Sequence, residues 1–378
     1  MGRPDYWLLA LVALLVILGL QAVYSASFVL ALTQYGSATY FVARQALWAA
    51  VGAVSLIVCM KINYRLWKTL SSLLMLGTVI ALAAVLVPGI GTERYGAIRW
   101  LQLGPLPPVQ PSEFAKLALV IYVSALLATK GEKLRRFSSG FVPFIITMAL
   151  VAGLVILEPD MGTTVILVLS AATIFFLAGA DFKHLILLAT IILVALALFS
   201  VVAGYRSDRW EAFFNAEQDP AGKGFHILQL LIALGSGGIT GLGLGASRQK
   251  FFWVPSSHTD GIFAIIGEEL GFVGCLLIIA LFAALAYRGF RLYREAPDEF
   301  GALLAAGITC CISYQTIINI AGITRSIPLT GIPLPFISSG GSSLAVCMAG
   351  IGILLNISKQ VKAQRSRRRG GVADAEAQ

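Results

Sequence analysis

Ten long runs of mainly apolar residues, separated by short charged segments, dominate this chain of 378 residues. A helix needs about 20 such residues to cross the hydrocarbon core of a bilayer. Only 12% of the residues are charged, whereas soluble domains hold about 25%, so the chain cannot cover a water-facing globule of this size. We therefore predict an all-α polytopic membrane protein of about ten transmembrane helices. The runs fall at 7–31, 45–60, 69–90, 112–129, 137–157, 161–180, 185–204, 261–287, 301–322 and 338–357.

The distribution of basic residues predicts the orientation of these helices. An even number of spans places both termini on one side, and a cytoplasmic N-terminus puts most Lys and Arg in cytoplasmic segments, as the positive-inside rule requires. The net charge of +9 thus reflects membrane orientation, and we expect no nucleic-acid partner. The first run is too long for a signal peptide. The tail at 359–378 is predicted to be a disordered cytoplasmic end whose cations contact membrane lipid.

Two segments outside the membrane are longer than a turn requires. We expect 1–358 to form one transmembrane domain with a large extracytoplasmic loop at 205–260, before the eighth helix. Part of this loop, 225–247, is apolar enough to dip into the interface, but its glycines argue against a full span. The second segment, 323–341, combines prolines with a Ser/Gly cluster, so its backbone groups must be satisfied by protein or by a water-filled cavity.

Asp260 is the most informative ionisable residue beside a predicted span. It ends the polar loop and directly precedes an apolar run. Partial burial at that boundary would suit a carboxylate to general-base work. The alternative is an N-cap for the helix that begins near Gly261, and the residues alone leave both interpretations open. His258 either orients this carboxylate or hydrogen-bonds the loop.

Other charged residues at span ends carry both structural and functional interpretations. Glu113 and Lys116 are either a helix start with an i,i+3 pair or a charged pair that faces an internal cavity. Asp160 is best explained as a helix cap. Glu268 and Glu269 are adjacent and point about 100° apart on a helix, which favours a structural role.

Several classes of chemistry have no support in the sequence. The five cysteines lie in apolar runs without disulfide or zinc spacing, and no Walker loop or hydrolase motif is present. Arg99 and Arg209 each precede a tryptophan on the predicted outer side. Such arginines are usually membrane anchors, but a guanidinium there also matches the phosphate oxygens of a lipid.

A series of short motifs occurs in order between about residues 7 and 357, and together they resemble the SEDS proteins (shape, elongation, division and sporulation), represented by FtsW, RodA and SpoVE. They are Gly96-Ala97-Ile98-Arg99-Trp100, Gln110-Pro111-Ser112-Glu113-Phe114-Ala115-Lys116, Glu158-Pro159-Asp160-Met161-Gly162-Thr163, Gly235-Ser236-Gly237-Gly238 with Gly241 and Gly243, His258-Thr259-Asp260, Gly267-Glu268-Glu269-Leu270-Gly271, Pro328-Leu329-Thr330-Gly331, and Leu334-Pro335-Phe336-Ile337-Ser338-Ser339-Gly340-Gly341-Ser342-Ser343.

The resemblance implies a peptidoglycan glycosyltransferase of the bacterial cytoplasmic (inner) membrane that polymerises lipid II into glycan strands at the outer face. It places the catalytic acid/base at Asp260, and it implies a class B penicillin-binding protein, a transpeptidase, as partner. A divalent cation, Mg or Mn, would share the work, although the sequence shows no ligand cluster. The residues that it assigns to lipid II and the growing strand are Arg99, Glu113, Lys116, Lys250, His258, Ser338, Gly340, Gly341 and Ser342.

The chain also departs from the family pattern. Ser256 and Ser257 stand where FtsW and RodA usually carry a Glu before the His, and Ser339 replaces a common Tyr. The stretch 243–250 resembles the FtsW branch more than RodA. Two other functions stay open, a lipid II flippase and a non-catalytic scaffold for the transpeptidase. The inner halves of the spans are nearly uncharged, which favours the enzyme, and the choice between division and elongation is left undecided.

Overall fold

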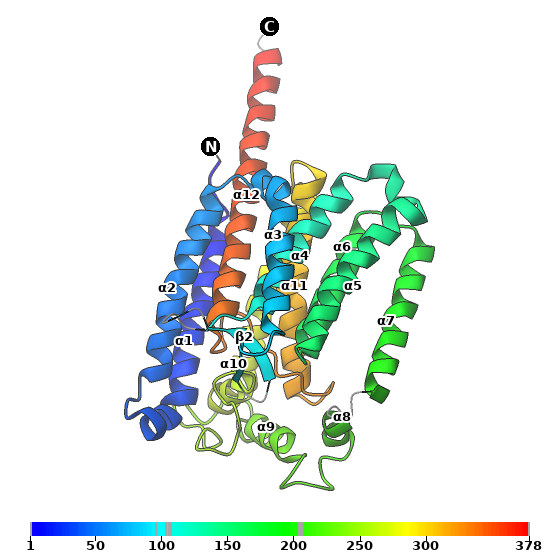
Figure 1. Cartoon of the computed structure of the whole chain (residues 1–378). Helices are drawn as coiled ribbons and strands as arrows, with labels where there is room; N and C mark the ends of the chain where they lie inside the picture. Colours follow the sequence, from blue (N-terminus) through cyan, green and yellow to red (C-terminus); the bar gives the residue numbers. More distant parts are fainter. Residues whose placement is uncertain (1, 95–96, 103, 105–107, 203–206, 377–378) are drawn as a thin grey trace.

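The computed structural model describes residues 2–94, 97–102, 104, 108–202 and 207–376. Its helices form one bundle, and both termini lie at the same end of it (Figure 1). The ten predicted runs correspond to ten helices, so the all-α polytopic fold is confirmed. These helices are α1 (Tyr6–Tyr35), α2 (Tyr40–Lys61), α3 (Tyr64–Val85), α4 (Pro111–Ala128), α5 (Val142–Leu157), α6 (Met161–Leu177), α7 (Phe182–Val202), α10 (Ile262–Glu295), α11 (Glu299–Ile323) and α12 (Gly341–Glu376).

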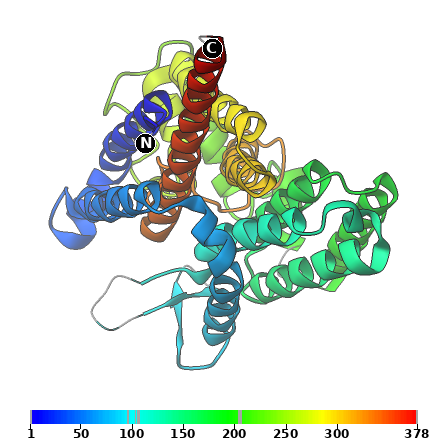
Figure 2. The ribbon, with the colours of Figure 1, turned by 90° about the horizontal axis from the view of Figure 1, so that it is seen from above.

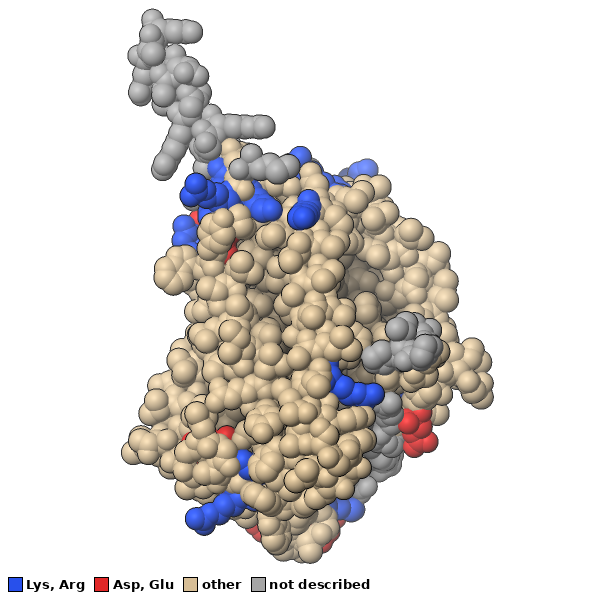
Figure 3. Space-filling view, turned by 90° about the vertical axis from the view of Figure 1, so that its left-hand side faces the viewer, with Lys and Arg blue, Asp and Glu red and all other residues tan. Residues whose placement is uncertain are grey.

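Eight helical segments of the described chain are long and apolar enough to cross a membrane. One of them joins α5 to the π-helical turn η2 (Phe137–Phe141), which follows the 3-10 turn η1 (Gly131–Arg135). The helix α6 and the described part of α7 are shorter apolar helices. On the face shown in Figure 3, Lys and Arg gather at the end where the termini lie, and the belt below it is almost uncharged.

The helices α4, α11 and α12 form the centre of the bundle and are the most buried spans. The helix α12 packs along α2, and α11 packs against α10, α6 and α4. Seen from above, α5, α6 and α7 form a separate side of the bundle, with α7 at its edge (Figure 2). The polar residues at the start of α4 are therefore enclosed by protein.

The helix α10 is broken at Gly271, which has φ +66°. The glycine-rich segment after α9 (Phe225–Ser236) satisfies the backbone there, because the Phe272 N–H donates to the Gly238 carbonyl at 2.9 Å and the Gly243 N–H donates to the Glu269 carbonyl at 3.0 Å. At about 1.5 Å per residue, the 12 residues of α9 reach about 18 Å, well short of a bilayer core of about 30 Å. Residues 225–247 thus fold against α10 without spanning.

The end of the bundle opposite the termini carries the loop elements. A hairpin of β1 (Gly91–Arg94) and β2 (Ala97–Leu101) lies between α3 and α4, and α8 (Ser207–Phe214) precedes α9 in the large loop (Figure 1). Residues 205 and 206, the predicted start of this loop, lie outside the described residues.

The basic tail differs from the sequence expectation. The helix α12 continues without a break to Glu376, so the backbone from 359 is helical where we expected disorder. Ala, Gln and Arg in this segment are strong helix formers, which explains the continuation. Residues 377 and 378 lie outside the described part of the chain.

Candidate active site

Asp260 lies directly before α10, at the end of the bundle opposite the termini. Its carboxylate is half-buried and accepts a hydrogen bond from the Thr259 hydroxyl at 3.0 Å. The N-cap of α10 is Gly261, and among the described residues no side chain caps this helix. The structure therefore does not support the helix-cap interpretation of Asp260, and it leaves the carboxylate available for chemistry.

Two neighbouring elements hold the backbone around Asp260. On α11, the Asn319 amide donates to the Asp260 carbonyl at 3.0 Å and to the Ile332 carbonyl at 2.7 Å. Beside Ile332, Gly331 has φ +73°, and a β-carbon there would lie 3.7 Å from Oδ2 of Asp260. The proline-rich segment thus passes next to the carboxylate, an arrangement that sequence motifs alone do not reveal.

Arg209 on α8 brings a cation to the same place. Its guanidinium donates to the Thr330 carbonyl at 3.1 Å and to the Leu329 carbonyl at 3.3 Å. Both carbonyls precede Gly331, the residue next to the Asp260 carboxylate. Of Arg99 and Arg209, the two arginines singled out beside tryptophans, Arg209 is the one that the fold brings to the candidate base.

His226, in the first turn of α9, also belongs to this cluster and was missed by the sequence analysis. Burial lowers the pKa of its imidazole, the Asp260 carboxylate raises it, and the Arg209 guanidinium lowers it. The sequence shows only a polar residue at the start of an apolar segment, and nothing in it indicates contact with the Asp260 region.

His258 holds the loop rather than the Asp260 carboxylate. Its backbone carbonyl accepts a hydrogen bond from the Ser339 N–H at 2.9 Å, and its ring packs on Phe41 with centroids 4.5 Å apart. Burial lowers the pKa of the His258 imidazole to about 4, so the ring is neutral at pH 7. Of the two roles considered, the structure favours the loop contact, and Thr259 orients the carboxylate.

The Ser/Gly segment before α12 is tied to α2 by Gln45. The Gln45 amide donates to the Ser338 carbonyl at 3.0 Å, and its oxygen accepts from the Gly340 N–H at 3.2 Å. Gly341 and Ser342 begin α12, where Ser342 is buried. Protein groups satisfy this irregular backbone, which is one of the two arrangements predicted for it.

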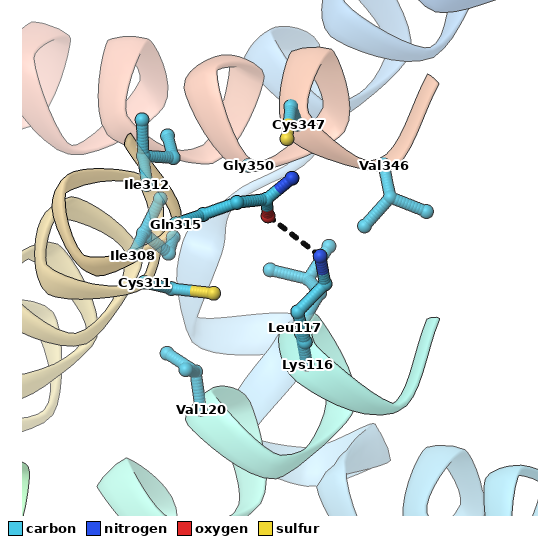
Figure 4. Close-up of a pocket in the computed structure, with 10 residues that line it drawn as sticks. All are labelled: Lys116, Leu117, Val120, Ile308, Cys311, Ile312, Gln315, Val346, Cys347 and Gly350. Atoms are coloured by element: carbon cyan, nitrogen blue, oxygen red, sulfur yellow. Dashed lines mark hydrogen bonds between the residues drawn. The ribbon is translucent and has the colours of Figure 1, made fainter. Parts of the chain in front are cut away.

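Glu113 and Lys116 form a buried ion pair at the start of α4. The Lys116 Nζ lies 2.8 Å from Oε2 of Glu113. It also donates to Oε1 of Gln315 at 2.6 Å, as Figure 4 shows. Lys116 and Gln315 line a small pocket between α4, α11 and α12, with a volume of about 30 Å³, enough for a water molecule. Glu113 lies in the first turn of α4 and pairs with Lys116 at i,i+3, as the helix-start interpretation predicts, while Lys116 also lines the pocket. Gln315 in turn donates at 2.9 Å to the carbonyl of Pro333, which belongs to the proline-rich segment that passes beside Asp260.

Lys250 is enclosed on the other side of the loop. Its ammonium lies 3.0 Å from Oε1 of Glu269 and also donates to the Ser25 hydroxyl at 3.2 Å and to the Gly245 carbonyl at 2.6 Å. Three protein partners use all three N–H bonds, so Lys250 has a structural role. Glu268 likewise accepts the backbone N–H of Arg248 at 2.9 Å, in agreement with the structural role expected of this pair.

The side chain of Arg99, in β2, contacts the junction of α5 and α6. Its guanidinium donates to the Glu158 carbonyl at 2.9 Å and also to the Pro159 carbonyl. The Glu158 carboxyl is buried, and neither oxygen has a hydrogen-bond partner among the described residues. Burial, with Asp160 nearby, raises the pKa of Glu158 to about 8, against a lowering effect of Arg99.

Asp160 accepts the Thr163 N–H at 3.1 Å and caps α6, as predicted.

The described residues offer no ready-made metal site. Within the described ranges, no three His, Cys, Asp or Glu side chains come together in a way that would hold an ion. The carboxylate of Asp260 alone does not fit a divalent cation that the protein itself would bind.

Comparison with known proteins identifies the family. The sequence model of the FtsW/RodA/SpoVE family, described as cell cycle protein, matches residues 6–363. The chain belongs to this family. The SEDS resemblance of the motifs is therefore confirmed, and the match covers every described element of the candidate site.

Individual SEDS proteins match over nearly their whole length. Stage V sporulation protein E of Bacillus subtilis is 41% identical over 356 residues, or 94% of this chain and 97% of that protein. A probable peptidoglycan glycosyltransferase FtsW of Trichlorobacter lovleyi is 41% identical over 364 residues, or 96% and 95%. These names support the FtsW-like leaning of this SEDS protein.

Solved structures share the fold. The crystal structure of the rod shape determining protein RodA of Thermus thermophilus is 27% identical with a TM-score of 0.69, and the match covers 94% of this chain and 97% of that chain. A chain from a study of how a peptidoglycan synthase complex coordinates polymerization and crosslinking is also 27% identical, with a TM-score of 0.76 and coverage of 94% and 98%.

Proposed function

We propose that this SEDS protein is a peptidoglycan glycosyltransferase that polymerises lipid II into glycan strands at the outer face of the bacterial cytoplasmic membrane. The FtsW relatives with that name match about 95% of the chain, which supports the activity. One observation carries the mechanism. The half-buried Asp260 carboxylate does not cap α10, and it lies at the end of the bundle opposite the basic termini. The positive-inside rule supports an outer location for this end and a cytoplasmic location for both termini.

The proposed reaction is an inverting displacement. The acceptor sugar hydroxyl oxygen forms a bond to the anomeric carbon of the donor, and the bond from that carbon to the prenyl pyrophosphate breaks. The hydroxyl proton passes to the Asp260 carboxylate, and the pyrophosphate leaves with the bonding electrons. Thr259 and Asn319 hold the base in place for this transfer.

Cations near the site stabilise the departing pyrophosphate. Arg209 is best placed for this, because its guanidinium donates to the Thr330 carbonyl, next to Gly331. Arg209 and Asp260 also both act on the pKa of His226. Arg99 and Lys116, which the resemblance assigns to lipid II, are held at other places: Arg99 binds carbonyls at the junction of α5 and α6, and Lys116 pairs with Glu113 in α4. We propose that Arg99 and Lys116 act indirectly, by holding the segments that they bind.

A resident Mg or Mn ion does not fit the described side chains, so we derive no step through a metal. For the partner, we infer a class B penicillin-binding protein that crosslinks the strands. The structural match to a chain of a peptidoglycan synthase complex supports that inference.

The test is polymerisation of lipid II by the purified full-length protein with its transpeptidase in liposomes. We expect glycan strands from the wild type and none from Asp260→Asn, with the thermal unfolding transition retained. Asp219→Asn is the matched control, since Asp219 lies exposed in the same loop and only bonds the backbone of Gly222 and Lys223. Strands of normal length from Asp260→Asn would refute the mechanism, and a flippase or scaffold would make no strands at all.

A further inference from the structure

Three aromatic side chains form a platform at the turn between α1 and α2, at the end of the bundle opposite the termini (Figure 1). The rings of Tyr35 and Tyr40 stack with centroids 3.8 Å apart and an angle of 7° between their planes. Phe41 meets both rings edge-on, at 5.6 Å from Tyr35 and 5.2 Å from Tyr40. Tyr35 is 49% exposed, so the platform leaves part of this ring uncovered by protein.

The exposed ring of Tyr35 lies beyond the hydrocarbon core of the membrane. Trp7, exposed near the start of α1, marks the interface at the end where the termini lie. At about 1.5 Å per residue, Tyr35 lies about 42 Å along α1 from Trp7, and a tilt of about 20° leaves about 39 Å across the bilayer. The core is about 30 Å thick, so lipid chains cover the exposed Tyr24, about 26 Å from Trp7, but not Tyr35.

The helix α2 connects this platform to the Asp260 loop. The Phe41 ring packs on the His258 ring with centroids 4.5 Å apart, and His258 precedes Asp260 by two residues. One turn further along α2, the Gln45 amide donates to the Ser338 carbonyl at 3.0 Å. The first two turns of α2 thus hold both the platform and the segments around the candidate base, and a long substrate at Asp260 extends toward Tyr35.

The groups around Tyr35 suit a sugar. The C–H bonds on one side of a sugar ring carry a slight positive charge and pack against the negative face of an aromatic ring. The hydroxyls at the edge of the sugar need polar partners. In the same turn, Ser37 and Thr39 carry exposed hydroxyls 3.2 Å apart, and the Arg44 guanidinium lies 4.9 Å from the centroid of the Tyr40 ring. A flat ring with a few polar groups beside it is typical of a site for a polar ligand.

We propose that Tyr35 is the stacking surface of a subsite that binds sugars of the growing glycan strand. This inference rests on the proposed function. The Tyr35 ring packs on one sugar, the polar side chains of the turn bond its hydroxyls, and Tyr40 with Phe41 fix the ring in place. A strand that is held between transfers receives many sugar units before it leaves. The subsite therefore sets the length of the strand and not the rate of the transfer at Asp260.

Strand length in the liposome assay with lipid II tests the subsite. Tyr35→Leu keeps an apolar contact with Tyr40 and Phe41 but removes the flat ring. We expect the mean strand length to fall about 10-fold, because a lost ring contact speeds release of the strand. The rate of the first transfer between two lipid II molecules should be unchanged. Tyr35→Phe keeps the ring and should make strands of wild-type length, as should the matched control Tyr24→Leu on the same helix.

Binding of a soluble sugar separates the subsite from the proposed reaction. Saturation-transfer NMR with chitotetraose and the full-length Asp260→Asn protein in detergent requires no polymerisation. We expect the sugar to bind this protein, and we expect Tyr35→Leu in the same background to raise its Kd about 10-fold. Tyr24→Leu in that background should leave the Kd unchanged.

Each other outcome overturns the proposal. Wild-type strand length and sugar affinity in Tyr35→Leu would show that the ring binds no strand, and equal losses in Tyr24→Leu would show that these tyrosines are only membrane anchors. The same losses in Tyr35→Phe would assign the effect to the hydroxyl instead of the ring face. If Tyr35→Leu fails to unfold cooperatively, Tyr35→Met decides by the same two measurements. Strands from Asp260→Asn would instead refute the proposed function, while the sugar titration still decides the subsite.

Discussion

The Asn319 side chain joins the two segments that form the Asp260 site, because its amide bonds the Asp260 carbonyl at 3.0 Å and the Ile332 carbonyl at 2.7 Å. The helix α11 thus sets the position of the base relative to the proline-rich segment. Neither segment has regular secondary structure at these residues, so one buried amide replaces the missing backbone pairing.

Asn319→Ala should reduce both stability and activity. Loss of both hydrogen bonds leaves two carbonyls unpaired, which costs about 1–3 kcal/mol of unfolding free energy. Displacement of Asp260 should lower kcat on the order of 10-fold to 100-fold. Thr316→Val is the control, since the buried Thr316 hydroxyl bonds only its own helix, at the Ile312 carbonyl. Equal activity of the two variants would show that Asn319 does not position the base.

The Glu113–Lys116 pair should show strong coupling in a double-mutant cycle. Lys116→Met leaves the Glu113 carboxylate buried and unpaired, and breaking such pairs costs about 3–5 kcal/mol. The double variant Glu113→Gln with Lys116→Met removes both charges and should recover much of that loss. Unfolding in detergent measures the cycle, and additive effects of the two substitutions would contradict the pairing.

Gly271→Ala should disrupt the break in α10. The residue has φ +66°, and a β-carbon would lie 2.3 Å from the Gly241 nitrogen, so we expect a loss of about 1–3 kcal/mol in unfolding free energy. Gly153→Ala is the matched control: Gly153 lies in α5 with open space around its β-carbon position, and alanine is the better helix former there. A Gly271→Ala protein as stable as Gly153→Ala would mean that α10 can straighten.

Glu158 should make stability depend on pH. Its pKa is raised to about 8 in the folded protein, above the ordinary value of 4.5, so the folded state holds a proton that the unfolded state releases. Stability from this group is therefore present below pH 4.5 and is lost as pH rises through about 8. Glu158→Gln should raise the Tm at pH 8 relative to the wild type and leave it nearly unchanged at pH 5. Parallel Tm curves for the two proteins would contradict the buried neutral carboxyl.

The sequence alone determined the fold class, the number of apolar helices and the family. Apolar runs long enough to cross a bilayer have few structural solutions, and the charges at their ends define the boundaries of the helices. The motif at Asp260 also predicted the candidate base, because an acidic residue at the edge of a span is costly and seldom incidental.

Only the tertiary structure decided which side chains surround that base. Arg209, His226 and Asn319 come from three helices separated by loops, and no local pattern reports their meeting at Gly331 and Asp260. Lys250 is the opposite case: the resemblance assigned it to lipid II, but in the structure its three N–H donors bind groups of the protein itself. A side chain's charge follows from its residue type, but whether that charge is free for a ligand depends on partners that long-range packing supplies.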